Sequence, residues 1–157
     1  MSLHFHPLRV RAVQPDTEEA VLVSFDVPDD LRETFRFQPG QYLTLRGDID
    51  GVDLRRSYSI CAGLDDGLLR VGVRKVPGGV FSTWANERLQ PGDTLQVFPP
   101  QGHFTTPLSA DAAPRHVVGI AGGSGITPIL SIMKSLLARE LRSRFTLLYG
   151  NRTPRST

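Results

Sequence analysis

The chain has 157 residues, of which 39% are hydrophobic and 22% are charged, and its formal net charge is +2. This composition supplies enough apolar material for a packed core and excludes a disordered chain, while the small charge gives no support for nucleic-acid binding. One cysteine, Cys61, excludes an internal disulfide or a cysteine-ligated iron–sulfur cluster, and no stretch approaches the ~20 apolar residues of a membrane span. We therefore expect a globular cytoplasmic protein without a nucleic-acid or membrane partner.

The first hundred residues predict antiparallel β-structure. Short alternating or β-branched segments are separated by turn pairs such as Pro39-Gly40 and Pro91-Gly92. This pattern indicates a barrel or a sandwich with about six strands, at 8–13, 20–27, 41–46, 54–60, 68–75 and 94–98. One helix is expected over 81–89.

The hydrophobic period changes near residue 115. Pro99-Pro100 and residues 109–114 are typical of a linker, and the apolar run 117–121 is typical of a strand in a parallel sheet. Residues 128–141 have helical spacing, with Thr127 as the expected cap and Pro128 at the first helical position. A strand at 145–149 completes one β-α-β unit. Because one unit cannot cover both faces of a sheet, we expect an incomplete doubly wound domain over residues 109–157, after a first domain over residues 1–108.

A glycine loop, Gly122-Gly123-Ser124-Gly125, lies between the expected strand and helix of this unit. Unpaired amides and the positive end of the helix dipole favour a phosphate at such a place. No Gly-Lys-Ser/Thr follows, which excludes a Walker loop, and the usual dinucleotide fingerprint is not met either. The loop therefore indicates a nucleotide phosphate site, with a simple chain turn as the alternative.

A second set of motifs lies in the first half. Arg56-Ser57-Tyr58-Ser59 is on an expected strand, and alone it fits a half-buried strand as well as a site. Gly78-Gly79 precedes Ser82 at the start of the short helix, which is again suited to an anion.

Taken in order with Phe37–Tyr42 and the glycine loop, these motifs resemble the ferredoxin-NADP reductase family of flavoproteins. Within that family the sequence most resembles reductase components of bacterial oxygenase systems, such as that of phenylacetate degradation. The resemblance covers the chain from about residue 5 onward and implies a six-stranded antiparallel flavin-binding barrel followed by a nucleotide-binding domain.

The resemblance also implies roles for individual residues. Arg56 would pair with the flavin pyrophosphate, Tyr58 would stack on the isoalloxazine ring, and Ser59 would lie near flavin N5. The strand with Val73, Arg74 and Lys75 would hold the pyrimidine end of the flavin, and Gly79 with Ser82 would contact phosphate. Gly122, Gly123, Gly125 and Thr127 would lie under the nicotinamide dinucleotide, with Thr127 near the hydride-transfer region. Tyr58, Ser59 and Thr127 are thus the residues expected closest to the chemistry.

The implied activity is electron transfer from NAD(P)H through FAD to an iron–sulfur protein or an oxygenase component. A [2Fe-2S] cluster is expected only if a further C-terminal domain exists, so the chain is expected to be a fragment. The alternative is a non-catalytic barrel that binds flavin or a protein. The choice between NADPH and NADH stays open, although Arg152 and Arg155 could reach a 2′-phosphate.

Overall fold

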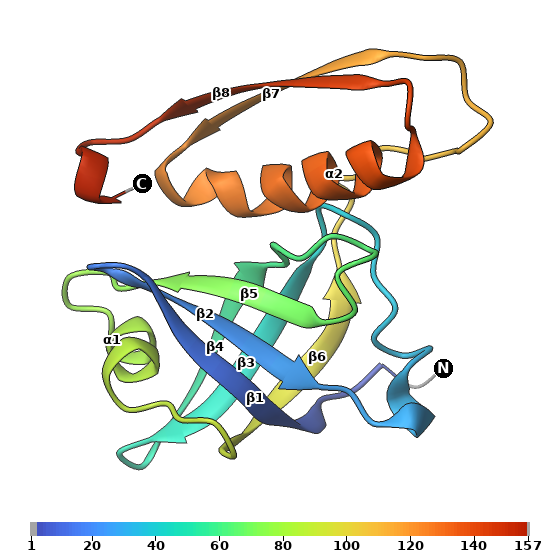
Figure 1. Ribbon diagram of the computed structural model, residues 1–157. Coiled ribbons are helices and arrows are strands. Elements are labelled where there is room, and N and C mark those ends of the chain that lie inside the picture. The colour runs from blue at the N-terminus through green and yellow to red at the C-terminus, as the bar shows by residue number, and fades with distance from the viewer. Residues whose placement is uncertain (1–2, 157) are drawn as a thin grey trace.

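The structure is a computed structural model and describes residues 3–156. It consists of an antiparallel barrel below and a helix with a two-stranded parallel sheet above (Figure 1). The barrel contains β1 (His6–Thr17), β2 (Ala20–Asp26), β3 (Tyr42–Ile49), β4 (Val52–Ser59), β5 (Leu69–Arg74) and β6 (Thr94–Gln101). Helix α1 (Val80–Glu87) lies at one end of it, and a 3-10 turn, η1 (Asp29–Leu31), follows β2. The predicted six-stranded antiparallel barrel is confirmed.

The strands of the barrel follow the order β4-β3-β6-β1-β2-β5. Alternate residues point inward and form one core, since successive side chains of a strand leave on opposite faces. The core includes residues of five strands that are almost fully buried: Leu8, Val10, Val23, Phe25, Leu43, Leu45, Val71, Val73, Leu95 and Val97. Phe81 and Ala85 of α1 close this core at its end.

Strand β6 is longer than the sequence predicts. The expected linker residues Pro99 and Pro100 belong to the strand, where Gln101 pairs with Tyr42 and Phe98 with Thr44. A register shift separates these two pairs, so a local irregularity accommodates the two residues that have no amide N–H to donate. The prediction that Pro99 and Pro100 belong to a linker is therefore wrong.

The upper layer contains β7 (His116–Gly122), a 3-10 turn η2 (Gly123–Gly125), α2 (Ile126–Arg139), β8 (Arg144–Gly150) and a 3-10 turn η3 (Pro154–Ser156). Strands β7 and β8 pair in parallel, and α2 lies between this sheet and the barrel (Figure 1). The predicted β-α-β unit is confirmed. The division of the chain after residue 108 stays a prediction.

The predicted helix cap is wrong. The residue before α2 is Gly125, and Thr127 is the second residue of the helix, where its Oγ1 donates to the Ser124 carbonyl at 3.0 Å. The chain begins to wind one turn earlier than expected, because Gly123 adopts φ +52° and the glycine loop forms a 3-10 turn.

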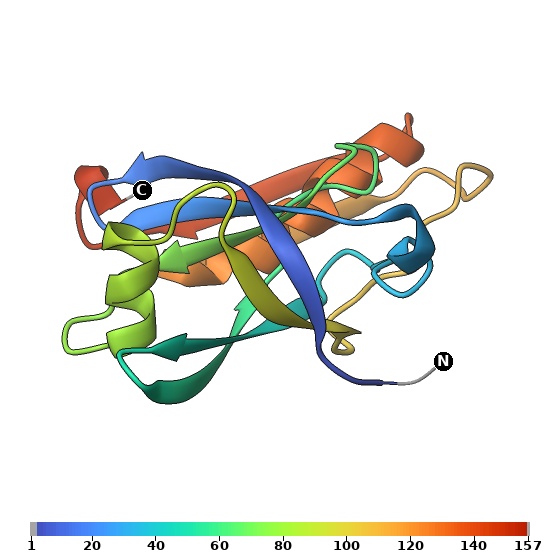
Figure 2. The same ribbon diagram turned by 90° about the horizontal axis from the view of Figure 1, so that it is seen from below.

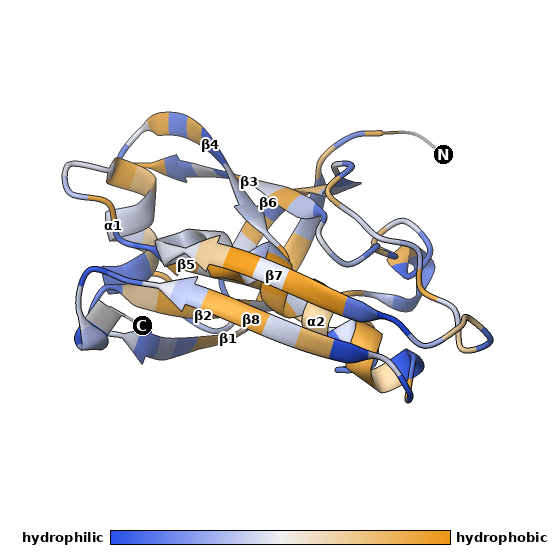
Figure 3. Cartoon of the chain, turned by 90° about the horizontal axis from the view of Figure 1, so that it is seen from above, coloured by the Kyte–Doolittle hydropathy of each residue, from blue (hydrophilic) through white to orange (hydrophobic). Residues whose placement is uncertain are grey.

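One face of the two-stranded sheet lacks a cover. Val117, Gly119 and Ala121 point toward α2, whereas Val118, Ile120 and Leu148 point away and are 55%, 73% and 55% exposed. Figure 3 looks onto these two strands and shows hydrophobic residues along much of β7. This face agrees with the predicted incomplete domain. No helix within residues 3–156 is long and apolar enough to cross a membrane.

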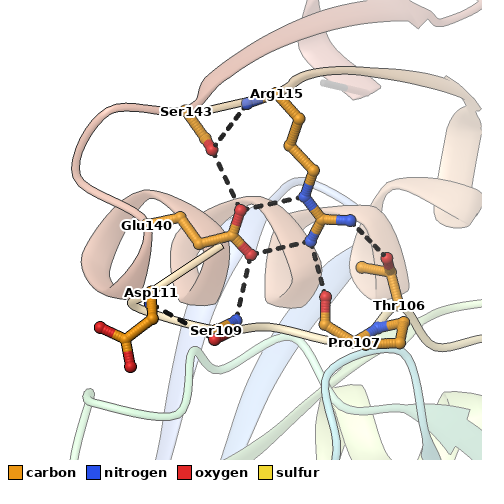
Figure 4. Close-up of polar contacts among 7 residues, drawn as sticks. All are labelled: Thr106, Pro107, Ser109, Asp111, Arg115, Glu140 and Ser143. Carbon is orange, nitrogen blue, oxygen red and sulfur yellow. Dashed lines mark hydrogen bonds and ion pairs between the residues drawn. The ribbon is translucent and has the colours of Figure 1, made fainter. Parts of the chain in front are cut away.

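The segment that joins the two layers is tied to the end of α2 through Glu140 (Figure 4). This carboxylate is 3% exposed and accepts hydrogen bonds from Arg115 Nε at 2.9 Å, Arg115 Nη2 at 2.8 Å, Ser143 Oγ at 3.0 Å and the Ser109 amide at 3.3 Å. Arg115 Nη2 also donates to the Pro107 carbonyl at 2.6 Å. The connecting segment is therefore held at several points by one ion pair.

The Glu140 pair predicts a pH-dependent stability. Hydrogen bonds from Arg115 hold the pKa of Glu140 below its ordinary value of 4.5, so the pair contributes stability above that pH and loses it as the pH falls through the lowered pKa. We expect Glu140→Gln to lower the thermal unfolding midpoint by several degrees at neutral pH. The difference from the parent should shrink as the pH falls below 4.5, because the parent carboxylate then takes up a proton.

Thermal unfolding of both proteins across this pH range checks the prediction. Asp111→Asn is the control, since Asp111 is an exposed carboxylate of the same segment without an ion pair among the residues described. If the unfolding midpoint of Glu140→Gln lies as far below that of the parent in acid as at neutral pH, the prediction is contradicted.

Candidate functional site

The barrel has an open seam between β4 and β5, the two ends of its sheet order. A single bridge, Ile60 to Val71, joins these strands, and beyond it their edges separate. Figure 2 shows α1 at the end of the barrel where β5 ends. Arg56, Tyr58 and Ser59 lie on one edge of the seam and Val73 lies on the other, so the structure brings these predicted flavin residues together.

Arg56 supplies the charge at this seam. Its side chain is exposed and its Nη1 donates to the Arg55 carbonyl at 2.6 Å. No carboxylate of residues 3–156 pairs with Arg56, in contrast to Arg46, which holds Asp53 through three hydrogen bonds of 2.8–3.1 Å. An unmatched guanidinium on a rigid strand suits a phosphate or pyrophosphate group.

Tyr58 supplies an aromatic surface beside Arg56. Its ring lies 6.0 Å from that of Phe81, which in turn packs edge-on against Trp84 at 5.6 Å. Burial raises the pKa of the Tyr58 hydroxyl, so the residue is neutral at physiological pH. The Ser59 hydroxyl has no hydrogen-bond partner in the part of the chain that the structure describes, which leaves it available to a ligand.

The start of α1 has a backbone suited to an anion, although its serine is engaged. Ser82 is 5% exposed, and its Oγ accepts from the Val76 amide at 3.0 Å and lies 3.4 Å from the Gly79 carbonyl. No side chain caps the helix, so the first amides of α1 have no acceptor within it. Ser82 thus shapes the loop that presents these amides, and a Cβ on Gly79 would approach its Oγ to 2.6 Å.

The charged side chain next to the β5 edge is engaged within the protein. Lys75 Nζ is paired with Glu87 of α1, which neutralises its charge. Asn86 Nδ2 donates to the Val73 carbonyl at 3.1 Å and to the Ser82 carbonyl at 2.8 Å. Asn86 therefore links the seam to α1, a role that no local motif in the sequence indicates.

A pocket of about 450 Å³ lies at the glycine loop. It is lined by Arg74, Gly122, Gly123, Ser124, Gly150, Asn151 and Arg152. Arg74 reaches it from the barrel, with Nη1 3.5 Å from the place where a Cβ on Gly123 would stand and Nη2 3.4 Å from Glu19 Oε2. The structure therefore places the Arg74 side chain at the glycine loop, and it adds Asn151, which the motifs did not indicate.

The seam and this pocket are adjacent because successive side chains of β5 point to opposite faces of the strand. Val71 and Val73 point into the barrel core, while Gly72 and Arg74 point toward the upper layer. The Thr127 methyl group packs on Gly72, where a Cβ would come within 3.1 Å of it. Strand β5 thus forms one edge of the seam and contacts the glycine loop with its outer face.

Other residues form no competing centre. Burial raises the pKa of the Cys61 thiol to about 11, which disfavours the reactive thiolate. No cluster of metal-binding side chains occurs within residues 3–156. A larger cavity, of about 1080 Å³, contains none of the predicted site residues. Its arginines Arg11, Arg32, Arg36 and Arg139 each have an acidic partner, so we assign no ligand to it.

Comparison with known families agrees with this geometry. The family described as the oxidoreductase FAD-binding domain matches residues 8–106, which include the whole seam. The chain belongs to this family. The oxidoreductase NAD-binding domain matches residues 120–157, beginning just before the glycine loop. FAD and a nicotinamide nucleotide, the cofactor and substrate expected from the motifs, are therefore the ligand types of the two matched domains.

A component of the 1,2-phenylacetyl-CoA epoxidase of Escherichia coli (strain K12) is 47% identical over 152 residues, which are 97% of this chain and 42% of that protein. Phthalate dioxygenase reductase, described as a modular structure for electron transfer from pyridine nucleotides to [2Fe-2S], has a TM-score of 0.79 and 27% identity. It is matched over 98% of this chain and 46% of its own chain.

A ferredoxin NADP+ reductase from Neisseria gonorrhoeae, with bound FAD and NADP, has the same fold, with a TM-score of 0.80 and 21% identity. It is matched over 99% of this chain and 61% of its own chain. The predicted resemblance to ferredoxin-NADP reductases is confirmed. The chain spans about two fifths of the length of the curated relative.

Proposed function

We propose that this chain forms the FAD-binding barrel and the first part of the nucleotide-binding unit of an NAD(P)H-dependent reductase. The reductase passes electrons to an iron–sulfur acceptor of an oxygenase system, such as one that acts in phenylacetate degradation. The similarity to the epoxidase component supports the assignment to an oxygenase system, and the similarity to phthalate dioxygenase reductase supports an iron–sulfur acceptor. The observation that carries the proposal is the meeting of the flavin seam and the glycine loop on β5, through Gly72–Thr127 and Arg74–Gly123.

The donor set of the seam fits FAD. An unpaired guanidinium at Arg56 and free amides at the start of α1 match two linked phosphates, and Tyr58 offers a ring backed by Phe81. Bound flavin supplies hydride acceptance and single-electron release, which protein side chains do not provide. The residues present have the task of positioning: Arg56 and the α1 amides hold phosphate, Tyr58 orients a planar ring, and Ser59 offers a hydroxyl at its edge.

The side of the glycine loop binds and orients the nicotinamide nucleotide. Its free amides, together with Arg74 and Arg152, surround the pocket with donors for phosphate oxygens. Thr127 follows the glycine loop and packs on Gly72, which supports its predicted role near the point where the two ligands approach each other. Exclusion of water at this point is expected from the close contact of α2 with the barrel.

The visible spectrum of the complete protein tests the proposed function. We expect the absorbance of bound flavin, its loss on anaerobic addition of NADH or NADPH, and release of FAD as identified by mass spectrometry. Bound flavin that neither nucleotide reduces would instead support a non-catalytic binding module. Release of FMN in place of FAD would refute the assignment of FAD as the cofactor, while the seam would remain the proposed flavin site.

Arg74 provides a prediction specific to the nucleotide. We expect Arg74→Ala to raise the KM for the nicotinamide nucleotide by about 10-fold without loss of flavin, since a hydrogen bond to a charged group contributes about 1.5–3 kcal/mol. Steady-state kinetics and the flavin content of the purified variant measure both effects. Arg70→Ala is the matched control, because Arg70 leaves the same face of β5 but binds Ser24 and Gln14. Loss of flavin with an unchanged KM would show that Arg74 serves the flavin instead.

A further inference from the structure

Helix α2 meets the barrel through two serines that are fully buried. Ser131 Oγ donates to the Ala62 carbonyl at 2.6 Å, and Ser135 Oγ accepts from the Leu64 amide at 3.0 Å. Both side chains are 0% exposed and lie four residues apart, so they share one face of the helix. The surface between the two layers thus contains two directed polar contacts in place of apolar ones.

The loop that receives these serines continues directly from the flavin strand. Ile60 follows Ser59, its amide donates to the Gln41 carbonyl at 2.9 Å, and its bridge to Val71 closes the barrel. Gly63 lies against the helix, where a Cβ would come within 3.0 Å of Lys134 Cβ. The backbone that leaves the seam is therefore in direct contact with the middle of α2.

The two hydrogen bonds have opposite polarity along the helix. Ser131 donates a hydrogen bond and Ser135 accepts one. A shift of α2 along its axis or a rotation about it therefore breaks both contacts and leaves the Ala62 carbonyl and the Leu64 amide without these partners. Apolar packing has no such direction and tolerates sliding more readily. Ion pairs of Lys134 with Asp66 and of Arg139 with Asp65 flank the serines, but these are partly exposed and contribute less.

Ser131 lies four residues beyond Thr127, about 6 Å along the helix axis. A helix turn is stiff over this distance, so the serine contacts fix how far Thr127 and the glycine loop extend over Gly72. We propose that Ser131 and Ser135 are positioning residues that set the register of α2 on the barrel, and with it the approach of the nicotinamide to the flavin. This inference rests on the proposed function.

Transient kinetics of the complete, flavin-loaded protein test the inference. We expect Ser131→Ala/Ser135→Ala to keep its flavin and its KM for the nucleotide while the rate of flavin reduction falls by about 10–100-fold, the size of effect that a displacement of about 1 Å produces. Ser143→Ala is the matched control, since Ser143 is a buried serine with hydrogen bonds to Glu140 and Arg115 away from the barrel. The flavin of Ser143→Ala should be reduced at the same rate as that of the parent.

Two further measurements do not depend on the double variant, and the second of them does not depend on flavin reduction either. Gly63→Ala keeps both serines but pushes against Lys134, so it should slow flavin reduction in the same way. Hydrogen exchange of the Leu64 amide should accelerate at least tenfold in Ser135→Ala, and not in Ser143→Ala.

Reduction rates of the Ser131 and Ser135 variants equal to that of the parent, or an equal loss in Ser143→Ala, would overturn the inference. A parent that binds flavin but is not reduced by NADH or NADPH would overturn the proposed function, and the inference with it.

Discussion

Replacing Arg56 with alanine is expected to weaken flavin binding by about 10–100-fold. No carboxylate within residues 3–156 pairs with this guanidinium, in contrast to Arg46, and hydrogen bonds to charged groups contribute about 1.5–3 kcal/mol. Because the side chain is exposed and bonded only to a backbone carbonyl, its removal should leave the barrel intact. Titration of the flavin-free protein with FAD, followed by fluorescence, measures the change.

Arg55→Ala is the control for this experiment. Arg55 is the preceding residue of the same strand, but it faces away from the seam and lies over the Phe5 ring, 5.2 Å from its centroid. Equal losses of affinity in both variants would indicate a general effect of positive charge. An Arg56→Ala variant that binds FAD as tightly as the parent would show that Arg56 is only a solvated strand residue.

Replacing Phe81 with alanine should have the largest effect on stability, a loss of about 3–5 kcal/mol in the free energy of unfolding. Phe81 is 1% exposed and packs between the rings of Tyr58 and Trp84, so its removal leaves a cavity in the core that α1 closes. The cavity also removes the support of Tyr58, and we expect weaker flavin binding as a second consequence.

Urea unfolding of the flavin-free protein separates the two effects, because no lost cofactor then contributes to the difference. Phe104→Ala serves as the comparison, since Phe104 is 60% exposed and its removal should change the stability by no more than about 0.5 kcal/mol. A Phe81→Ala variant within about 1 kcal/mol of the parent would mean that the helix collapses onto the barrel and fills the space.

Much of the fold could be predicted because its signals are local. Alternation of side chains located the strands of the barrel, and the change to helical spacing located α2. The errors arose where a local preference was overridden: Pro99 and Pro100 lie within β6, and glycine conformation moved the start of α2 before Thr127.

The site was predictable only as far as motifs reach. The positions of Arg56 and Tyr58 on one strand follow from their spacing, and their roles stay predictions. The direction of the Arg74 side chain, the link through Asn86 and the contacts of Ser131 with Ala62 depend on segments up to 69 residues apart in the sequence. No spacing rule gives such contacts, since they require the packing of one layer on another.

The alternation along β5 has a consequence for how this protein can change. Substitution at the outward positions 72 and 74 alters the surface toward the nucleotide while the barrel core stays as it is. A one-residue insertion or deletion within Leu69–Arg74 would exchange the two faces at once, turning Val71 and Val73 outward and Arg74 inward. Related sequences should therefore keep the length of this strand and differ in the side chain at 74, whereas position 72 has little room, since a Cβ there would come within 3.1 Å of Thr127.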